Sequence, residues 1–298
     1  MSEKKEIKYV DRSTGELIRE QIPGAGMLWF FYQTPLGRLP LNTLLRRKGI
    51  SAVAGRYMDS KRSKKWIRGF VEKHKMDLSD YQKQEEEFTT FNDFFYRKLK
   101  PGARPIGNGL VSPADGKTVV FNEVSDQQHF FIKGIDFTLE SFLADKRLAE
   151  KYDGGAMVIV RLAPVDYHRF HFPASGKTGS NKEVKGYYYS VSPLALQQNL
   201  KIFCENKREY SILDTEDYGD LLICEVGATM VGSILQTYPE NTQVEKGDEK
   251  GYFAFGGSTV VLLFEKGKVR FSEDLIKHTK EGIETQLKMG DQIGEAVK

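Results

Sequence analysis

The pattern of apolar and polar positions changes near residue 100 of this 298-residue chain. Residues 41–100 contain no proline, and within them residues 89–96 have the pattern of a capped helix start with an aromatic face. After the Pro-Gly-Ala-Arg-Pro break at 101–105, short β-rich runs are separated by glycine turns. The chain is therefore predicted to be α+β, helical over residues 1–100 and β-rich over residues 101–298. Three apolar runs predict buried strands, at residues 156–162, 221–226 and 258–264.

The composition is that of an ordinary globular protein, with 40% hydrophobic and 29% charged residues, and it excludes a disordered chain. A net charge of +3 gives no indication of nucleic-acid binding. The two cysteines, Cys204 and Cys224, exclude a disulfide-dense scaffold and a four-cysteine zinc site, and they favour a reducing compartment. No run approaches the roughly 20 apolar residues that span a bilayer, and the first residues lack the apolar core of a signal peptide. We therefore expect a protein that stays in the cytosol, where it can still bind a membrane surface.

Basic residues concentrate in one segment near the N-terminus. Residues 46–75 contain eleven Lys or Arg and two acidic residues, a local net charge of +9. An apolar stretch, Met-Leu-Trp-Phe-Phe-Tyr at residues 27–32, precedes this segment. Aromatic rings beside a basic cluster are typical of an interfacial membrane anchor, because rings sit at headgroup depth and each basic residue contributes about 1 kcal/mol near an anionic surface. The alternative is a helix that packs on the core and exposes a solvated basic face.

Two of the five histidines, His168 and His171, lie close together between Pro164 and Pro173. A spacing of three places two side chains on one face of a helix but on opposite faces of a strand. The flanking prolines and aromatic residues favour an extended or irregular segment, so the two rings can have separate roles. The alternative is a pair of ordinary hydrogen-bonded histidines. The sequence contains no HExxH, which excludes a helix-borne metalloprotease site of that type.

Two turn-forming segments add candidate residues. Ser-Pro-Ala-Asp-Gly-Lys at 112–117 has the composition of a hairpin loop, but its Asp115 can also orient a histidine, as the acidic member of a Ser-His-Asp set does. Gly256 and Gly257 directly precede Ser258 at the start of a predicted strand. This arrangement leaves the Gly257 carbonyl sterically open, and an ordinary β-turn is the alternative.

Taken together and in this order, these segments resemble the phosphatidylserine decarboxylase family of self-processing pyruvoyl enzymes. The resemblance rests on Pro-Ala-Asp-Gly at 113–116, Tyr-His-Arg-Phe-His at 167–171 and Gly-Gly-Ser-Thr at 256–259. The best-known bacterial branch has leucine where this chain has Gly256, and Gly-Gly-Ser-Thr occurs in another branch. The resemblance implies a β-rich, mostly antiparallel catalytic domain. Further matches lie at residues 94–97, 103–105, 226–232 and 246–253.

The resemblance also implies a triad of Asp115, His171 and Ser258 for self-cleavage between Gly257 and Ser258. A serine hydroxyl is a weak nucleophile near neutral pH and needs an adjacent base, which a carboxylate in turn orients. By the same family pattern, His168 is the proton donor in the later decarboxylation.

The implied product of cleavage is a pyruvoyl group made from Ser258, which is the covalent cofactor. It would bind the amine of phosphatidylserine as a Schiff base and accept electrons as carbon dioxide leaves, so that phosphatidylethanolamine forms. The subunits 1–257 and 258–298 are expected to remain a heterodimer, because the run 258–264 is apolar enough to be a central strand. The lipid substrate implies docking on an anionic membrane surface, as a peripheral protein on the cytoplasmic face of the cell membrane.

Two other interpretations compete with this one. Asp115, His168 and His171 can form a zinc site of two His and one Asp in a metal-dependent hydrolase, which predicts an uncut chain and leaves Ser258 without a role. A peripheral membrane scaffold that uses the basic segment predicts lipid binding without cleavage, unaffected by Ser258→Ala.

Overall fold

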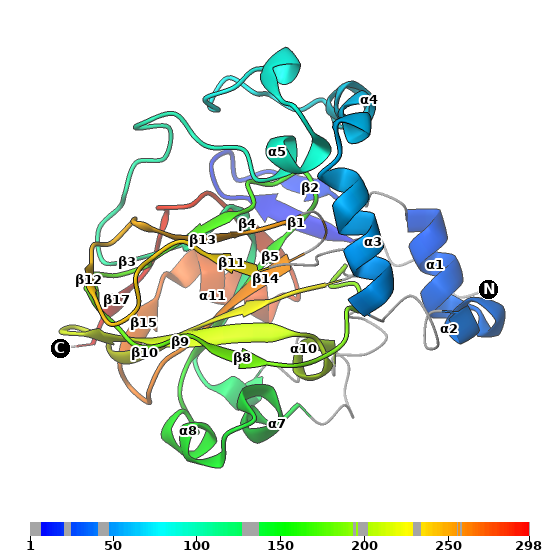
Figure 1. Cartoon of the computed structure of the whole chain (residues 1–298). Helices are drawn as coiled ribbons and strands as arrows, with labels where there is room; N and C mark the ends of the chain where they lie inside the picture. The colour runs from blue at the N-terminus through cyan, green and yellow to red at the C-terminus, as the bar shows by residue number, and fades with distance from the viewer. Residues whose placement is uncertain are drawn as a thin grey trace.

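The computed structural model describes residues 7–20, 25–40, 48–126, 137–192, 195, 202–228, 234–254, 256 and 258–297 (Figure 1). Helices and strands combine into an α+β fold around one large sheet, which confirms the predicted fold class. Over these residues, every helix is too short or too polar to cross a membrane.

The large sheet contains eleven of the described strands, and its neighbouring strands are antiparallel except for one pair. The exception is β1 beside β16. The strand β8 (Lys182–Val184) pairs with β9 away from the main path. The order along that path is β12 (Gln243–Val244), β7 (Gly176–Thr178), β9 (Arg208–Thr215), β10 (Gly219–Val226), β14 (Ser258–Leu263), β5 (Met157–Leu162), β4 (Gly116–Phe121), β16 (Glu284–Leu287), β1 (Lys8–Asp11) and β2 (Leu17–Arg19).

The three predicted strands form the centre of this sheet. β14 lies between β10 and β5, and every residue of β14 and of β5 is buried. Continuous apolar runs such as Val-Val-Leu-Leu are stable only where both faces of a strand are covered. The prediction of a central strand that begins at Ser258 is therefore confirmed.

Two three-stranded sheets pack near the large one. One is β11 (Ile234–Gln236), β13 (Glu249–Phe253) and β6 (Arg169–His171), in that order. The other is β15 (Val269–Phe271), β17 (Gln292–Ala296) and β3 (Leu110–Val111). The first matters for function, because β6 carries the histidine segment and β13 leads into the segment before Ser258.

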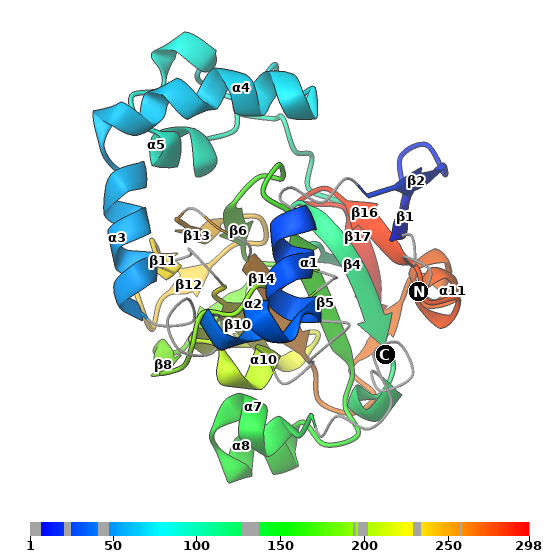
Figure 2. The same ribbon diagram turned by 90° about the vertical axis from the view of Figure 1, so that its right-hand side faces the viewer.

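The helices are short and lie around the sheets. Helix α5 begins as predicted, since the Thr90 side chain accepts a hydrogen bond from the backbone N–H of Asp93 and caps it. Helices α4 and α5 lie at one end of the molecule and α7 and α8 at the other (Figures 1 and 2). The described helices are α1 (Ala25–Gln33), α2 (Pro35–Pro40), α3 (Lys48–Met58), η2 (Lys61–Lys64), α4 (Lys65–His74), η3 (Glu85–Glu87), α5 (Phe91–Phe95), η4 (Val124–Asp126), α7 (Leu139–Leu143), α8 (Lys146–Lys151), α10 (Ile202–Glu205) and α11 (Glu273–Lys280).

Part of the predicted helical region, residues 1–100, forms strands instead. β1 and β2 form a hairpin that extends the large sheet, because β1 pairs with the distant strand β16. These strands are only four and three residues long and too polar to show a strand pattern by themselves. The rest of the region supplies most of a second, small core, to which Tyr167 from the β-rich part also belongs, and a boundary at residue 100 stays a prediction. That core consists of Ile67, Leu78, Tyr81, Phe88, Phe91, Phe94, Phe95 and Tyr167.

Candidate active site

Ser258 is the first residue of the central strand β14. It lies opposite Leu162 of β5, and the next residue, Thr259, lies opposite Val226 of β10. The Ser258 side chain is completely buried, and its Oγ has no hydrogen-bond partner among the described residues. A buried hydroxyl without a partner costs free energy, so its retention calls for a reason other than stability.

The segment before Ser258 connects β13 to β14. Gly257, the predicted acyl side of the cleavage site, lies outside the described residues. Gly256 has a φ of 142°, a backbone conformation that favours glycine. The N–H of Phe253, at the end of β13, donates to the carbonyl of His168 at 2.9 Å, so this connection starts beside the histidine segment.

His168 lies just before β6 and is completely buried, with its ring on that of Phe95 at a centroid distance of 3.8 Å. Nδ1 is 2.9 Å from the carbonyl oxygen of Asp166. Nε2 has no hydrogen-bond partner in the part of the chain that the structure describes, although the Gly256 backbone is close enough to raise the pKa of the ring. Burial dominates and, helped by the positive charge of Arg97, lowers the pKa of His168 to about 3. The ring is therefore neutral at physiological pH.

His171 is the last residue of β6 and is held at both ring nitrogens. Nδ1 is 2.9 Å from the carbonyl oxygen of Gly247, and Nε2 is 3.0 Å from the hydroxyl of Tyr167. The Tyr167 ring also stacks on the imidazole, with centroids 5.8 Å apart. Burial lowers the pKa of His171, and the negative charges of Glu249 and Asp115 oppose this shift.

Asp115 directly precedes β4, and its carboxylate is fully engaged. The Arg104 guanidinium donates to both oxygens, at 3.1 and 2.7 Å, and the backbone N–H of Met289 donates to Oδ1 at 2.8 Å. Asp115 is close enough to act on the pKa of His171, yet in the described part of the chain no hydrogen bond joins the two side chains.

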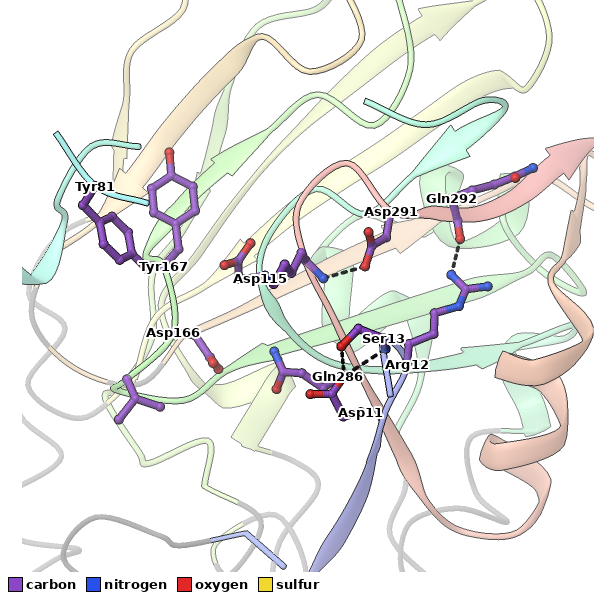
Figure 3. Close-up of a pocket in the computed structure, with 12 residues that line it drawn as sticks. Asp11, Arg12, Ser13, Tyr81, Asp115, Asp166, Tyr167, Gln286, Asp291 and Gln292 are labelled. Atoms are coloured by element: carbon purple, nitrogen blue, oxygen red, sulfur yellow. Dashed lines mark hydrogen bonds between the residues drawn. The ribbon is translucent and has the colours of Figure 1, made fainter. Parts of the chain in front are cut away.

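Two cavities border these residues, and Tyr167 lines both. The smaller, of about 310 Å³, contains His171, Gly247 and Arg104 in its wall. The larger, of about 540 Å³, contains Asp115 and reaches the N-terminal hairpin (Figure 3). Solvent-sized space therefore borders both Asp115 and His171.

The structure groups the predicted residues in two sets. Asp115 and His171 share one neighbourhood, and His168 lies beside the backbone that leads to Ser258. Sequence reasoning missed the residues that hold the first set, namely Tyr167, Arg104, Gly247 and Met289. The first three stand inside segments that carried the resemblance, whereas nothing in the sequence pattern marks Met289.

The zinc alternative has no geometric basis in this arrangement. The ring nitrogens of His171 and Nδ1 of His168 are engaged with other groups, and Asp115 is bound to Arg104. Across the residues that the structure describes, no three His, Cys, Asp or Glu side chains converge as metal ligands would.

Comparison with known proteins identifies the family. The family model for phosphatidylserine decarboxylase matches residues 91–295. The chain belongs to the phosphatidylserine decarboxylase family. That match spans Asp115, His168, His171 and Ser258. Relatives named phosphatidylserine decarboxylase proenzyme include those of Fusobacterium nucleatum (51% identity over 291 residues, 97% of each chain), Ruminiclostridium cellulolyticum (46% over 294 residues, 98% of each) and Chlamydia muridarum (44% over 296 residues, 98% of each).

Proposed function

We propose that this chain decarboxylates phosphatidylserine to phosphatidylethanolamine after cutting itself between Gly257 and Ser258. Membership of the family and the word proenzyme in the names of its relatives support this. The structural observation that carries it is the buried Oγ of Ser258, which has no partner among the described residues and lies at the first position of the central strand. Such a hydroxyl fits a nucleophile whose target is the adjoining peptide bond.

The proposed cleavage is a sequence of balanced steps. Ser258 Oγ gives its proton to His171, bonds to the Gly257 carbonyl carbon and displaces the amide nitrogen, which takes up a proton, so the peptide bond becomes an ester. Removal of the α-proton of residue 258 forms a carbon–carbon double bond and expels the Gly257 carboxylate. Tautomerisation and hydrolysis by one water then replace nitrogen with oxygen at residue 258 and release ammonia.

Asp115 supports His171 in this scheme through its negative charge. When formed, the pyruvoyl carbonyl at residue 258 supplies an electrophile for the substrate amine and an electron sink for the loss of carbon dioxide. The side chains of the protein must bind the headgroup, exclude water and return one proton to the product.

His168 is the proposed source of that proton. The Asp166 carbonyl can only accept, so it favours the tautomer in which Nδ1 carries the hydrogen and Nε2 is a lone pair. Since the pKa of about 3 keeps this ring neutral, Nε2 must take up a proton before it can donate one. An anionic substrate beside the ring favours that uptake by raising the pKa of His168.

The substrate is a lipid, so we propose that the protein docks on an anionic membrane surface, peripherally on the cytoplasmic face of the cell membrane. Exposed apolar side chains on α1 and α3 support this, notably Trp29 (47% exposed), Phe30 (42%) and Val53 (66%). Basic residues follow directly in η2 and α4. Part of the predicted anchor, residues 41–47 with Arg46 and Arg47, lies outside the described residues.

Intact mass spectrometry of the wild-type protein beside Ser258→Ala tests the proposal. We expect two wild-type chains, residues 1–257 and a 41-residue partner that carries a pyruvoyl N-terminus, and one uncut chain in the variant. A single uncut chain in both samples would refute self-cleavage. Release of carbon dioxide from phosphatidylserine by the cut protein then tests the substrate.

A further inference from the structure

The imidazole of His171 is oriented by groups other than Asp115. In a Ser-His-Asp set the carboxylate binds Nδ1 and thereby keeps Nε2 free to act as the base. Here the Gly247 carbonyl occupies that position at 2.9 Å, while the Asp115 carboxylate is bound by Arg104 and Met289.

These contacts define the tautomer of the ring. A carbonyl oxygen only accepts, so Nδ1 of His171 carries the hydrogen and Nε2 of the neutral ring is a lone pair. The Tyr167 hydroxyl must then donate to Nε2, across 3.0 Å. The two contacts stabilise the same tautomer, the one that a general base needs, and Nε2 can take the Ser258 proton once the Tyr167 hydroxyl releases this hydrogen bond.

Tyr167 is itself fixed in place. Its side chain is 2% exposed, stacks on the imidazole and lies 6.4 Å from the ring of Tyr81, beside which Figure 3 shows it. Both cavities that approach His171 and Asp115 are lined by Tyr167. No step of the proposed chemistry uses this buried hydroxyl.

We propose that Tyr167 is a positioning residue for His171, whose hydroxyl holds the imidazole in the orientation and tautomer required for self-cleavage. This rests on the proposed self-cleavage and adds the residue that prepares its base. In this proposal Asp115 acts on His171 through its negative charge, whereas Tyr167 and Gly247 orient the imidazole ring.

The proposed role of Tyr167 predicts the direction in which the pKa of His171 changes when the hydroxyl is removed. A donor to Nε2 stabilises the neutral ring, so its loss raises the pKa of His171 and moves the acid limb of the cleavage profile to higher pH. A hydrogen bond of ordinary strength corresponds to a shift of about 0.5–1 pH unit. The charged groups around the ring stay in place when only the hydroxyl is removed, and they are Asp115, Arg104, Glu249, Arg169, Lys98 and Lys100.

The test compares Tyr167→Phe with wild type in a pulse of cell-free synthesis, following the rate of self-cleavage against pH. We expect the acid limb to move up by about 0.5–1 pH unit and the plateau rate to fall about tenfold or more, because a base that is no longer oriented acts poorly. Tyr81→Phe is the matched control. Its hydroxyl, also buried, contacts Arg97 at 3.1 Å and not His171, so its profile should coincide with that of wild type.

Three outcomes would overturn the proposal. The first is a Tyr167→Phe profile that coincides with wild type, and the second is an equal change in Tyr81→Phe. The third is faster cleavage by Tyr167→Phe at every pH, which would mean that the hydroxyl blocks the base. Failure of wild type itself to cut would instead refute the proposed function. If Tyr167→Phe cuts too slowly to follow, an NMR titration of His171 in the uncuttable Ser258→Ala chain, with and without Tyr167→Phe, replaces the kinetic test. There the removal of the hydroxyl must raise the titration midpoint of His171, and an unchanged midpoint refutes the proposal.

Discussion

The backbone N–H of Met289 donates a 2.8 Å hydrogen bond to the carboxylate of Asp115, although the two residues are 174 positions apart. Under the proposed cleavage they belong to different subunits. The 41-residue chain therefore contributes more than the reactive residue, because its β16–β17 connection also holds the acidic group beside His171. The site is complete only when both subunits are present.

Arg104→Leu is expected to destabilise the uncut Ser258→Ala protein by about 3–5 kcal/mol, because it leaves the Asp115 carboxylate buried without its cation. Asp115 is 6% exposed, and within the described residues only the Met289 N–H is a further donor to it. Urea unfolding measures the loss. In the double variant Arg104→Leu/Asp115→Asn most of the stability should return, and an equally unstable double variant would contradict the explanation.

His168 should make the folded state less stable in acid. The folded pKa of about 3 lies below the ordinary value of about 6.5, so between these pH values the unfolded chain binds a proton that the folded chain does not. Stability contributed by the neutral ring is therefore lost as the pH falls from 6.5 towards 3. His168→Asn in the Ser258→Ala background should gain about 3 kcal/mol relative to its parent between pH 7.5 and pH 4. The other titrating groups are common to both proteins and cancel, so a constant difference across this range would contradict the prediction.

The two subunits should elute together from size-exclusion chromatography, at equal stoichiometry and in 1 M salt. The small chain supplies β14, which pairs on both sides with strands of the large chain. It also supplies Glu284, whose carboxylate binds the buried Arg161 beside Glu20. Separation should need denaturant, and a free 41-residue chain under native conditions would disprove this.

Membrane docking through α1 is tested with sedimentation on phosphatidylserine vesicles at low salt. Trp29→Ser/Phe30→Ser should weaken binding about tenfold or more, since two half-exposed aromatic side chains no longer enter the interface. Leu17→Ser/Val297→Ser removes comparably exposed apolar side chains from other elements and should bind as wild type does. Binding should also weaken at high salt, because the basic cluster is screened. An equal loss of vesicle binding in both double variants would argue against α1 as the anchor.

Local patterns in the sequence predicted the elements that depend on neighbouring residues. The buried strands β5, β10 and β14 follow from continuous apolar runs, and the start of α5 follows from Thr90 and the aromatic residues after it. The hairpin β1–β2 could not be predicted from a local pattern, because its position depends on pairing with β16 near the other end of the sequence.

The same distinction holds at the site. Ser258, His168, His171 and Asp115 stand in recognisable segments, so the sequence alone marks them as candidates. Which groups hold them was not predictable, because the contacts to Gly247 and Met289 join residues 76 and 174 positions apart. The hydrogen bonds between Tyr167 and His171 and between Asp166 and His168 span only a few residues, and Tyr167 and His171 lie inside one motif.

Ser258 is the first residue of the central strand. The proposed self-cleavage therefore indicates whether a chain has folded. A chain whose sheet has not assembled has no ordered partner for its serine and cannot acquire the reactive carbonyl, so under the proposed cleavage inactive and misfolded molecules remain full length. Under the same proposal each chain is cut once, since the cleavage breaks the peptide bond before residue 258 and consumes its serine. The number of active sites in a cell would then equal the number of chains that have folded correctly, and the ratio of cut to uncut protein would measure folding yield directly.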